Sequence, residues 1–128
     1  MREQIYYKAL KMSIISKELK NLIEKNVLVL ATVGKRKPHC IAVGDAKVVD
    51  GNNLVITDNY MEETIRSIKK NKNISLIFWK GNAYELRGTC KYFTKGKWLD
   101  FVKKMPENKG LPAKGAVLIN VKKIKKSA

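Results

Sequence analysis

The stretch from Tyr84 to Tyr92 alternates strictly between two kinds of side chain, and it constrains the fold more than any other part of the sequence. One face would carry Tyr84, Leu86, Gly88, Cys90 and Tyr92, and the other Glu85, Arg87, Thr89 and Lys91. A period of two places successive side chains on opposite faces of a β-strand. The sequence therefore predicts a long strand, and a sheet on which the other elements pack.

Polar turns between short apolar runs predict that most neighbouring strands are antiparallel. The turn at 50–53, Asp-Gly-Asn-Asn, separates strands expected at 46–49 and 54–57, and the turn at 34–37 separates strands at 27–33 and 38–43. Further strands are expected at 74–79, 84–92 and 116–121. The continuous apolar runs at 27–33 and 74–79 are typical of strands buried on both faces.

Three helices are expected from apolar side chains that recur with helical spacing. The first carries a stripe at 14–23, begins at Ser13 or Ser16, and ends at Asn26 in the left-handed conformation. The second begins with a capping box of Asn59 and Glu62, and the third spans 98–105. The element order α-β-β-β-β-α-β-β-α-β is mainly β with peripheral helices, and it predicts a small antiparallel split β-barrel.

Length and composition predict one domain, 1–128, with an N-terminal helical segment at 1–25 and a basic tail at 122–128. No apolar run is long enough to cross a bilayer, and the N-terminus lacks the apolar core of a signal peptide. Two cysteines form no disulfide framework. A cytoplasmic protein without membrane contact is expected.

The net charge of +16 raises the question of nucleic-acid binding. Its lysines are scattered through loops and helices, and no RNA-binding or zinc-finger motif accompanies them. The charge is therefore weak evidence for such a partner. With His39 as the only histidine, neither a serine triad nor a His-rich metal site is credible.

The junction at 54–71 is the candidate functional stretch. A short strand turns at Thr57, Asp58 and Asn59 into the second helix, whose first backbone N–H groups and positive dipole end point into the turn. This arrangement can bind an anion. An ordinary strand–helix junction would have the same local sequence, so the stretch alone leaves both interpretations open.

Several motifs in order along the chain resemble the flavin-binding split barrels related to pyridoxamine 5′-phosphate oxidase, especially their small single-domain FMN-binding members. They comprise the segments at 29–33, 37–39 and 48–56, then Met61, Thr64, 67–68 and Asn71, and finally 74–76, 87–89 and 116–121. The resemblance implies a homodimer that holds one FMN in each of two clefts between subunits. Some relatives bind the deazaflavin F420 or haem instead, so these two are the alternative cofactors, less favoured than FMN.

The resemblance also implies a set of cofactor-binding residues. The strand before Gly44 would line the flavin ring, the turn and second helix would hold the phosphate, and a loop of the other subunit would cover the ring. The set is Ala42, Val43, Gly44, Thr57, Asp58, Asn59, Met61, Thr64, Arg66, Leu111 and Pro112. The chain departs from the family at Glu63, where small FMN-binding proteins tend to carry lysine, and Arg66 is the nearest replacement cation.

The function expected from this resemblance is that of an FMN-binding redox protein or oxidoreductase with an open substrate, in which the cofactor supplies the chemistry. No catalytic residue is indicated, and no metal site is expected. Two alternatives of another class remain: a flavin carrier without catalysis, and a basic barrel that binds nucleic acid.

Overall fold

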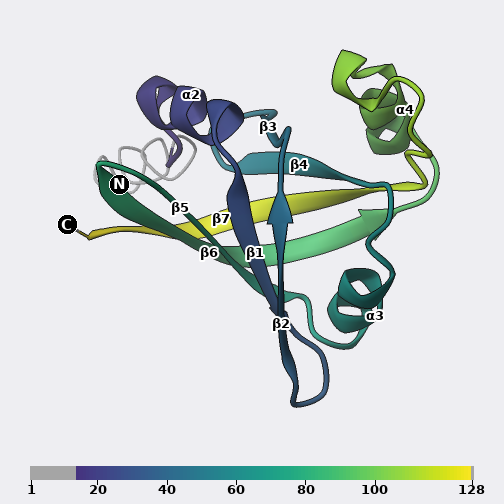
Figure 1. The fold of residues 1–128 in the computed structure, drawn as a ribbon, viewed down its shortest axis with the longest axis horizontal. Coiled ribbons are helices and arrows are strands. Elements are labelled where there is room, and N and C mark those ends of the chain that lie inside the picture. Colours follow the sequence, from purple (N-terminus) through teal and green to yellow (C-terminus); the bar gives the residue numbers. More distant parts are fainter. Residues whose placement is uncertain (1–13, 128) are drawn as a thin grey trace, which may run out of the picture.

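The computed structural model describes residues 14–127, which form one curled seven-stranded sheet with helices around it (Figure 1). All neighbouring strands are antiparallel, in the order β2-β1-β5-β6-β7-β4-β3. The fold is mainly β, and the predicted split barrel is confirmed. The strands are β1 Leu28–Val33, β2 Pro38–Val43, β3 Lys47–Val48, β4 Asn53–Asp58, β5 Asn73–Lys80, β6 Asn82–Phe93 and β7 Gly115–Ser127; the helices are α2 Lys17–Lys25, α3 Glu62–Lys70, α4 Lys97–Lys104 and the 3₁₀ turn η1 Pro106–Asn108.

The main core fills the inside of the curled sheet. It joins fully buried side chains of α2, β1, β5 and β6, among them Ile23, Leu30, Phe78 and Leu86. A smaller cluster around Val102 lies between α4 and the other face of β4 and β7. As a result β4 is the strand buried on both faces.

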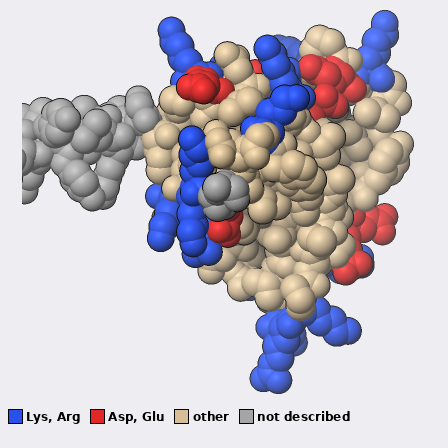
Figure 2. Space-filling view, turned by 60° about the vertical axis from the view of Figure 1, so that its left-hand side comes forward, with Lys and Arg blue, Asp and Glu red and all other residues tan. Residues whose placement is uncertain are grey.

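The prediction of two-sided burial for the runs at 27–33 and 74–79 is wrong. In β1 and β5 burial alternates, and outward side chains remain accessible: Ile77 is 39% exposed and Trp79 65%. Val27, directly before β1, is 62% exposed. Figure 2, which brings the left-hand side of Figure 1 forward, shows a broad area without charged side chains. Apolar side chains in these strands therefore cover a second, outer face.

The pairing of β6 with β7 forms the longest ladder of the sheet. It contains one irregularity between Arg87 and Gly88, where a Cβ on Gly88 would lie 1.9 Å from the carbonyl oxygen of Asn120. Only glycine permits this approach. The segment expected to be a basic tail, 122–128, differs from that expectation, because β7 continues through it to Ser127.

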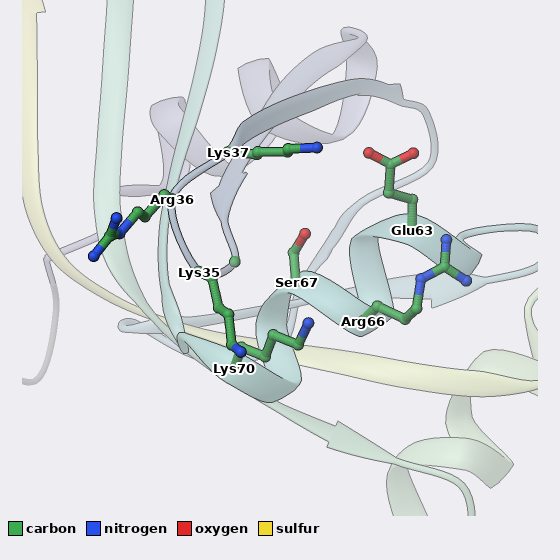
Figure 3. A pocket seen from close by; sticks show the side chains of 8 residues that line it. Lys35, Arg36, Lys37, Glu63, Arg66, Ser67 and Lys70 are labelled. Carbon is green, nitrogen blue, oxygen red and sulfur yellow. The ribbon is translucent and has the colours of Figure 1, made fainter.

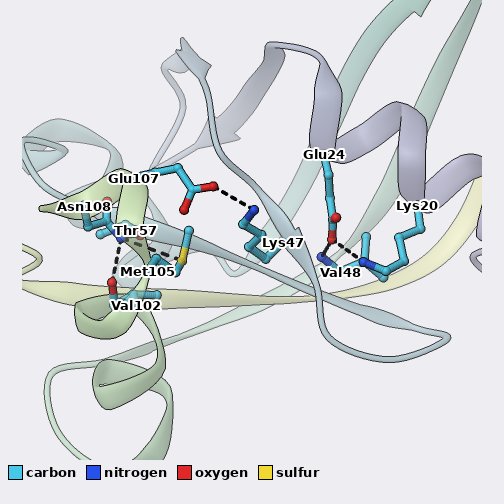
Figure 4. A network of polar contacts seen from close by, with 9 residues as sticks. All are labelled: Lys20, Glu24, Lys47, Val48, Thr57, Val102, Met105, Glu107 and Asn108. Atoms are coloured by element: carbon cyan, nitrogen blue, oxygen red, sulfur yellow. Dashed lines mark hydrogen bonds and ion pairs between the residues drawn. The ribbon is translucent and has the colours of Figure 1, made fainter.

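Helix α2 protects one edge of the sheet. Its Glu24 carboxylate accepts hydrogen bonds from the backbone N–H of Val48 in β3 (2.8 Å) and from Lys20 Nζ (2.7 Å), as Figure 4 shows. The helix begins after Ser16, whose hydroxyl accepts from Leu19 N; the alternative Ser13 lies outside the described residues. Asn26 does not adopt the predicted left-handed conformation, since its φ is −124°, and it instead donates to Leu22 O.

Candidate functional site

The turn between β4 and α3 is organised by a buried carboxylate. Asp58 is 3% exposed, and its two oxygens accept hydrogen bonds from Met61 N (2.9 Å) and the Tyr92 hydroxyl (2.6 Å). Helix α3 begins after Met61 without a side-chain cap. The predicted capping box is therefore wrong, because Asp58 organises the turn and the side chain of Asn59 bonds elsewhere.

Two residues of the turn bond to the segment after α4. Buried Asn108 donates from Nδ2 to Thr57 Oγ1 (2.8 Å) and to Val102 O (2.7 Å), as Figure 4 shows. Asn59 Oδ1 accepts from Ala113 N at 2.7 Å. These bonds fix the loop that contains Leu111 and Pro112 to the turn. Leu111 itself is 43% exposed.

A hollow of about 360 Å³, which we call the strand-end hollow, lies where β2 ends beside this turn. It is lined by Ile41, Ala42, Val43, Gly44, Asp45, Thr57, Asn59, Tyr60 and Met61. Six of the eleven predicted site residues thus meet in one place. The other three, Ile41, Asp45 and Tyr60, were not among the predicted site residues; a φ of 58° at Asp45 and 74% exposure of Tyr60 become visible only in the structure.

A larger and strongly basic hollow of about 910 Å³ lies beside helix α3 (Figure 3). The turn between β1 and β2 forms one wall and α3 the other. This basic hollow is lined by Gly34, Lys35, Arg36, Lys37, Glu63, Arg66, Ser67 and Lys70. Of the predicted residues it contains Arg66. The cationic turn is evident in the sequence, but its position against α3 is not.

His39 connects the strand to the helix between the two hollows. Its Nε2 lies 3.2 Å from Thr64 Oγ1, and its Nδ1 lies 3.1 Å from a carboxylate oxygen of Glu63. Thr64 is 1% exposed, so its hydroxyl faces the imidazole in a buried position. His39 and Thr64 are 25 residues apart, and the sequence contains no sign of this contact.

Burial dominates the two large pKa shifts near these elements. Burial, and after it the hydrogen bond and charge of Asp58, raises the pKa of Tyr92 to about 12. Burial raises the pKa of the Cys90 thiol to about 11, so this cysteine stays protonated at neutral pH. Tyr92 can therefore donate to Asp58 over the whole physiological range.

The described part of the chain holds no group of three His, Cys, Asp or Glu side chains arranged to bind a metal ion. None of the helices described in residues 14–127 has the length and apolar character needed to cross a membrane.

The open antiparallel sheet, with a hollow at the end of its edge strand, defines a split-barrel protein. The sequence profile of the pyridoxamine 5′-phosphate oxidase family matches residues 15–128, and the chain belongs to that family. No curated protein matches it significantly in sequence.

Solved structures agree with this assignment. Group A Streptococcus HupZ is 24% identical with a TM-score of 0.79, covering 88% of this chain and 93% of HupZ. An FMN-binding protein from Syntrophomonas wolfei is 14% identical with a TM-score of 0.73, covering 99% of this chain and 92% of that protein. General Stress Protein 26 from Bacillus anthracis is 19% identical with a TM-score of 0.67, covering 87% and 92%. At these identities the likeness is one of fold.

Proposed function

We propose that the chain is an FMN-binding redox protein that holds the flavin ring in the strand-end hollow. The observation that carries the proposal is the gathering there of Ala42, Val43, Gly44, Thr57, Asn59 and Met61, all of them expected from the family resemblance. The volume of about 360 Å³ is within the range of small-molecule sites. Membership of the pyridoxamine 5′-phosphate oxidase family and the FMN-binding neighbour of like fold support it.

The donor set of the strand-end hollow suits a flavin ring. β2 is an edge strand, so backbone N–H and C=O groups on its outer side pair with no described strand. Such groups can hydrogen-bond the alternating donors and acceptors on the polar edge of the ring. Tyr60 offers an exposed aromatic side chain beside the hollow. When bound, the flavin would supply the electron or hydride transfer.

The phosphate of the cofactor would lie beside the first two turns of α3. Thr64, which is 1% exposed, holds its hydroxyl against the His39 imidazole there, and Arg66 is the first cation along the helix. Asp58 would not oppose the phosphate strongly, because its carboxylate is turned inward to Met61 N and Tyr92. Glu63 is the remaining unfavourable charge, and its pairing with His39 reduces its effect.

Assembly as a homodimer completes this proposal. The outer face of β5 exposes Ile77 and Trp79, Val27 is exposed directly before β1, and isologous pairing of two such faces would bury them. A two-fold partner could bring the loop with Leu111 and Pro112 over the ring. Both cysteines are free thiols, which supports a reducing compartment such as the cytoplasm.

Titration with FMN, followed by the flavin absorption band and its fluorescence, tests the cofactor. Binding at micromolar protein is expected, with F420 and haem as parallel titrations. If none of the three binds, the flavin function is excluded. Turnover with NAD(P)H then distinguishes an enzyme from a carrier.

Light scattering of Ile77→Lys and Trp79→Ser variants tests the assembly. We expect a dimeric wild type and monomeric variants that bind FMN weakly. A wild-type monomer with tight flavin binding would contradict a cleft built from two subunits.

A further inference from the structure

We infer that the basic hollow is a second anion site, which binds a ligand with two or more adjacent phosphate groups. This second site goes beyond the proposed flavin function, because the flavin ring is assigned to the strand-end hollow and the flavin phosphate to the region of Thr64. Inorganic polyphosphate and the phosphate chain of a nucleotide share the chemistry that this site would recognise.

The first support is an excess of unpaired positive charge. Five cations line the hollow, namely Lys35, Arg36, Lys37, Arg66 and Lys70. None of these five cations forms an ion pair with another residue in the described part of the chain. The one acid of the lining, Glu63, pairs with His39 instead. Like charges held together repel at distances within the Debye length of about 8 Å, so a bound anion would stabilise this arrangement.

The ordinary role of surface lysines explains only part of the cluster. Lys70 lies in the last turn of α3, where a cation complements the helix dipole. That role does not extend to Lys35, Arg36 and Lys37, which belong to a hairpin turn that could extend into solvent. The turn instead faces the helix across the hollow (Figure 3).

Gly34 and Ser67 lie next to each other where the two walls of the hollow meet. Gly34 faces Ser67, and an added Cβ would lie in ordinary van der Waals contact with Ser67 Cα and Oγ, at 3.5 Å. Ser67 is 9% exposed, and its hydroxyl points into the hollow in Figure 3. Lys35 and Lys70 lie to one side of Ser67 in this view, whereas Lys37 lies to the other. Three lysines thus lie on the two sides of a hydroxyl group, whereas the Arg36 side chain points away from it in this view.

The size and charge of the hollow favour several phosphates over one. Arg66 and Glu63, which also face the proposed flavin phosphate, cancel each other, and the four remaining cations give a net charge of +4. A single phosphate ester carries about −1.5 to −2 at neutral pH and would neutralise at most half of it. No aromatic side chain lines the hollow, so nucleic-acid bases would find no stacking surface there. The chemistry therefore selects for phosphate groups and not for bases.

Calorimetric titration of the full chain with inorganic tripolyphosphate tests this site. The double variant Lys35→Gln/Lys70→Gln should lose about tenfold or more in affinity, because charge-assisted hydrogen bonds are the strong ones. The charge-keeping variant Lys35→Arg/Lys70→Arg should stay close to wild type. The matched control is Lys103→Gln/Lys104→Gln, which removes the same charge from exposed positions at the end of α4. This control should also bind like wild type.

Three results would overturn the inference. Equal losses in the two glutamine variants would show attraction by the overall charge of +16 alone. Inorganic phosphate binding as tightly as tripolyphosphate would remove the need for adjacent phosphates. A single-stranded oligonucleotide binding more tightly, with affinity rising with its length, would indicate a nucleic-acid surface.

Two further titrations identify the ligand and separate this site from the flavin. ATP binding more tightly than tripolyphosphate would indicate a nucleotide, and equal binding an inorganic chain; both agree with the inference. The Lys35→Gln/Lys70→Gln variant should retain FMN affinity. If this variant loses affinity for FMN and for tripolyphosphate together, the basic hollow is the flavin-phosphate site and the second site does not exist.

Discussion

His39 and Thr64 are joined across β2 and α3, with the imidazole Nε2 3.2 Å from the threonine hydroxyl. The other ring nitrogen lies 3.1 Å from the Glu63 carboxylate. When neutral His39 donates from Nδ1 to Glu63, its Nε2 accepts the hydroxyl hydrogen of Thr64. In the other tautomer, with the proton on Nε2, the imidazole donates to the Thr64 oxygen, and the hydroxyl hydrogen is free to bond a phosphate.

Thr64→Val should weaken FMN binding about tenfold or more, because a hydrogen bond to a charged group is worth roughly 1.5–3 kcal/mol. Riboflavin lacks the phosphate, so its affinity should hardly change. Fluorescence titrations with both ligands measure the difference, with Thr94→Val in an exposed loop as the control. An equal change for FMN and riboflavin would show that the phosphate is not held at this helix.

Glu63→Lys should strengthen FMN binding, since it replaces a carboxylate of the first turn with the cation that related small proteins tend to carry. The same substitution removes the contact with His39 Nδ1, at an exposed position where such polar pairs contribute at most about 1 kcal/mol to stability. Titration with FMN and riboflavin again isolates the phosphate. Weaker FMN binding with unchanged riboflavin binding would place the phosphate elsewhere.

Asn108→Ala should lower the free energy of unfolding by about 1–3 kcal/mol, because Val102 O and Thr57 lose a buried partner. It should also weaken FMN binding, since Thr57 lines the strand-end hollow. Urea unfolding and FMN titration are the two measurements. Asn73→Ala, at an exposed position, should leave both unchanged. A destabilised variant with normal FMN affinity would show that the contacts of Asn108 do not contribute to FMN binding.

Gly88→Ala should cost about 3 kcal/mol or more in unfolding free energy, because its Cβ would meet the backbone of Asn120 and not a side chain that can move. Gly44→Ala is the matched control, since nothing lies within 4 Å of the added Cβ. Thermal or urea unfolding of both variants measures the contrast. Equal stability of the two would mean that the β6–β7 ladder relaxes easily at its irregularity.

Comparison with Tyr92→Phe should show that the wild-type protein loses stability at alkaline pH. The pKa of Tyr92 is raised from 10.0 to about 12, so the folded state keeps a proton that the unfolded state releases first. The stabilisation is complete below pH 10 and is lost as pH rises toward 12. The variant, about 1.5 kcal/mol less stable at pH 8, should approach wild type over this window. Tyr60→Phe, at an exposed site, should follow wild type throughout.

The sequence predicted the strands well because alternation and turn residues act locally. The turn at Asp50, where one carboxylate oxygen accepts from Asn52 N and Asn53 N, forms as expected. Burial was predicted less well. The apolar run of β5 looks like a strand covered on both sides, yet Trp79 is exposed, because an apolar residue looks the same whether its own subunit or another molecule covers it.

The candidate site could be predicted only in part. Residues on one strand or turn, such as Ala42 and Thr57, were assigned through the family pattern, and the structure brings them together. The contacts of His39 and Asn108 join segments 25 and 51 residues apart, and no local pattern encodes them. The basic hollow was missed for the same reason, since its two walls are separate in sequence.

The position of β7 governs the order in which the molecule can fold. β7 lies between β6 and β4 and pairs Asn53 with Asn120 across 67 positions of the chain. Until β7 has been synthesised, β4 and β6 each present an unpaired edge that can capture another strand. Such distant pairing slows folding, because the closing of a long loop precedes the contacts that stabilise it. On the ribosome, the nascent chain must therefore keep these two edges apart from other chains until β7 emerges.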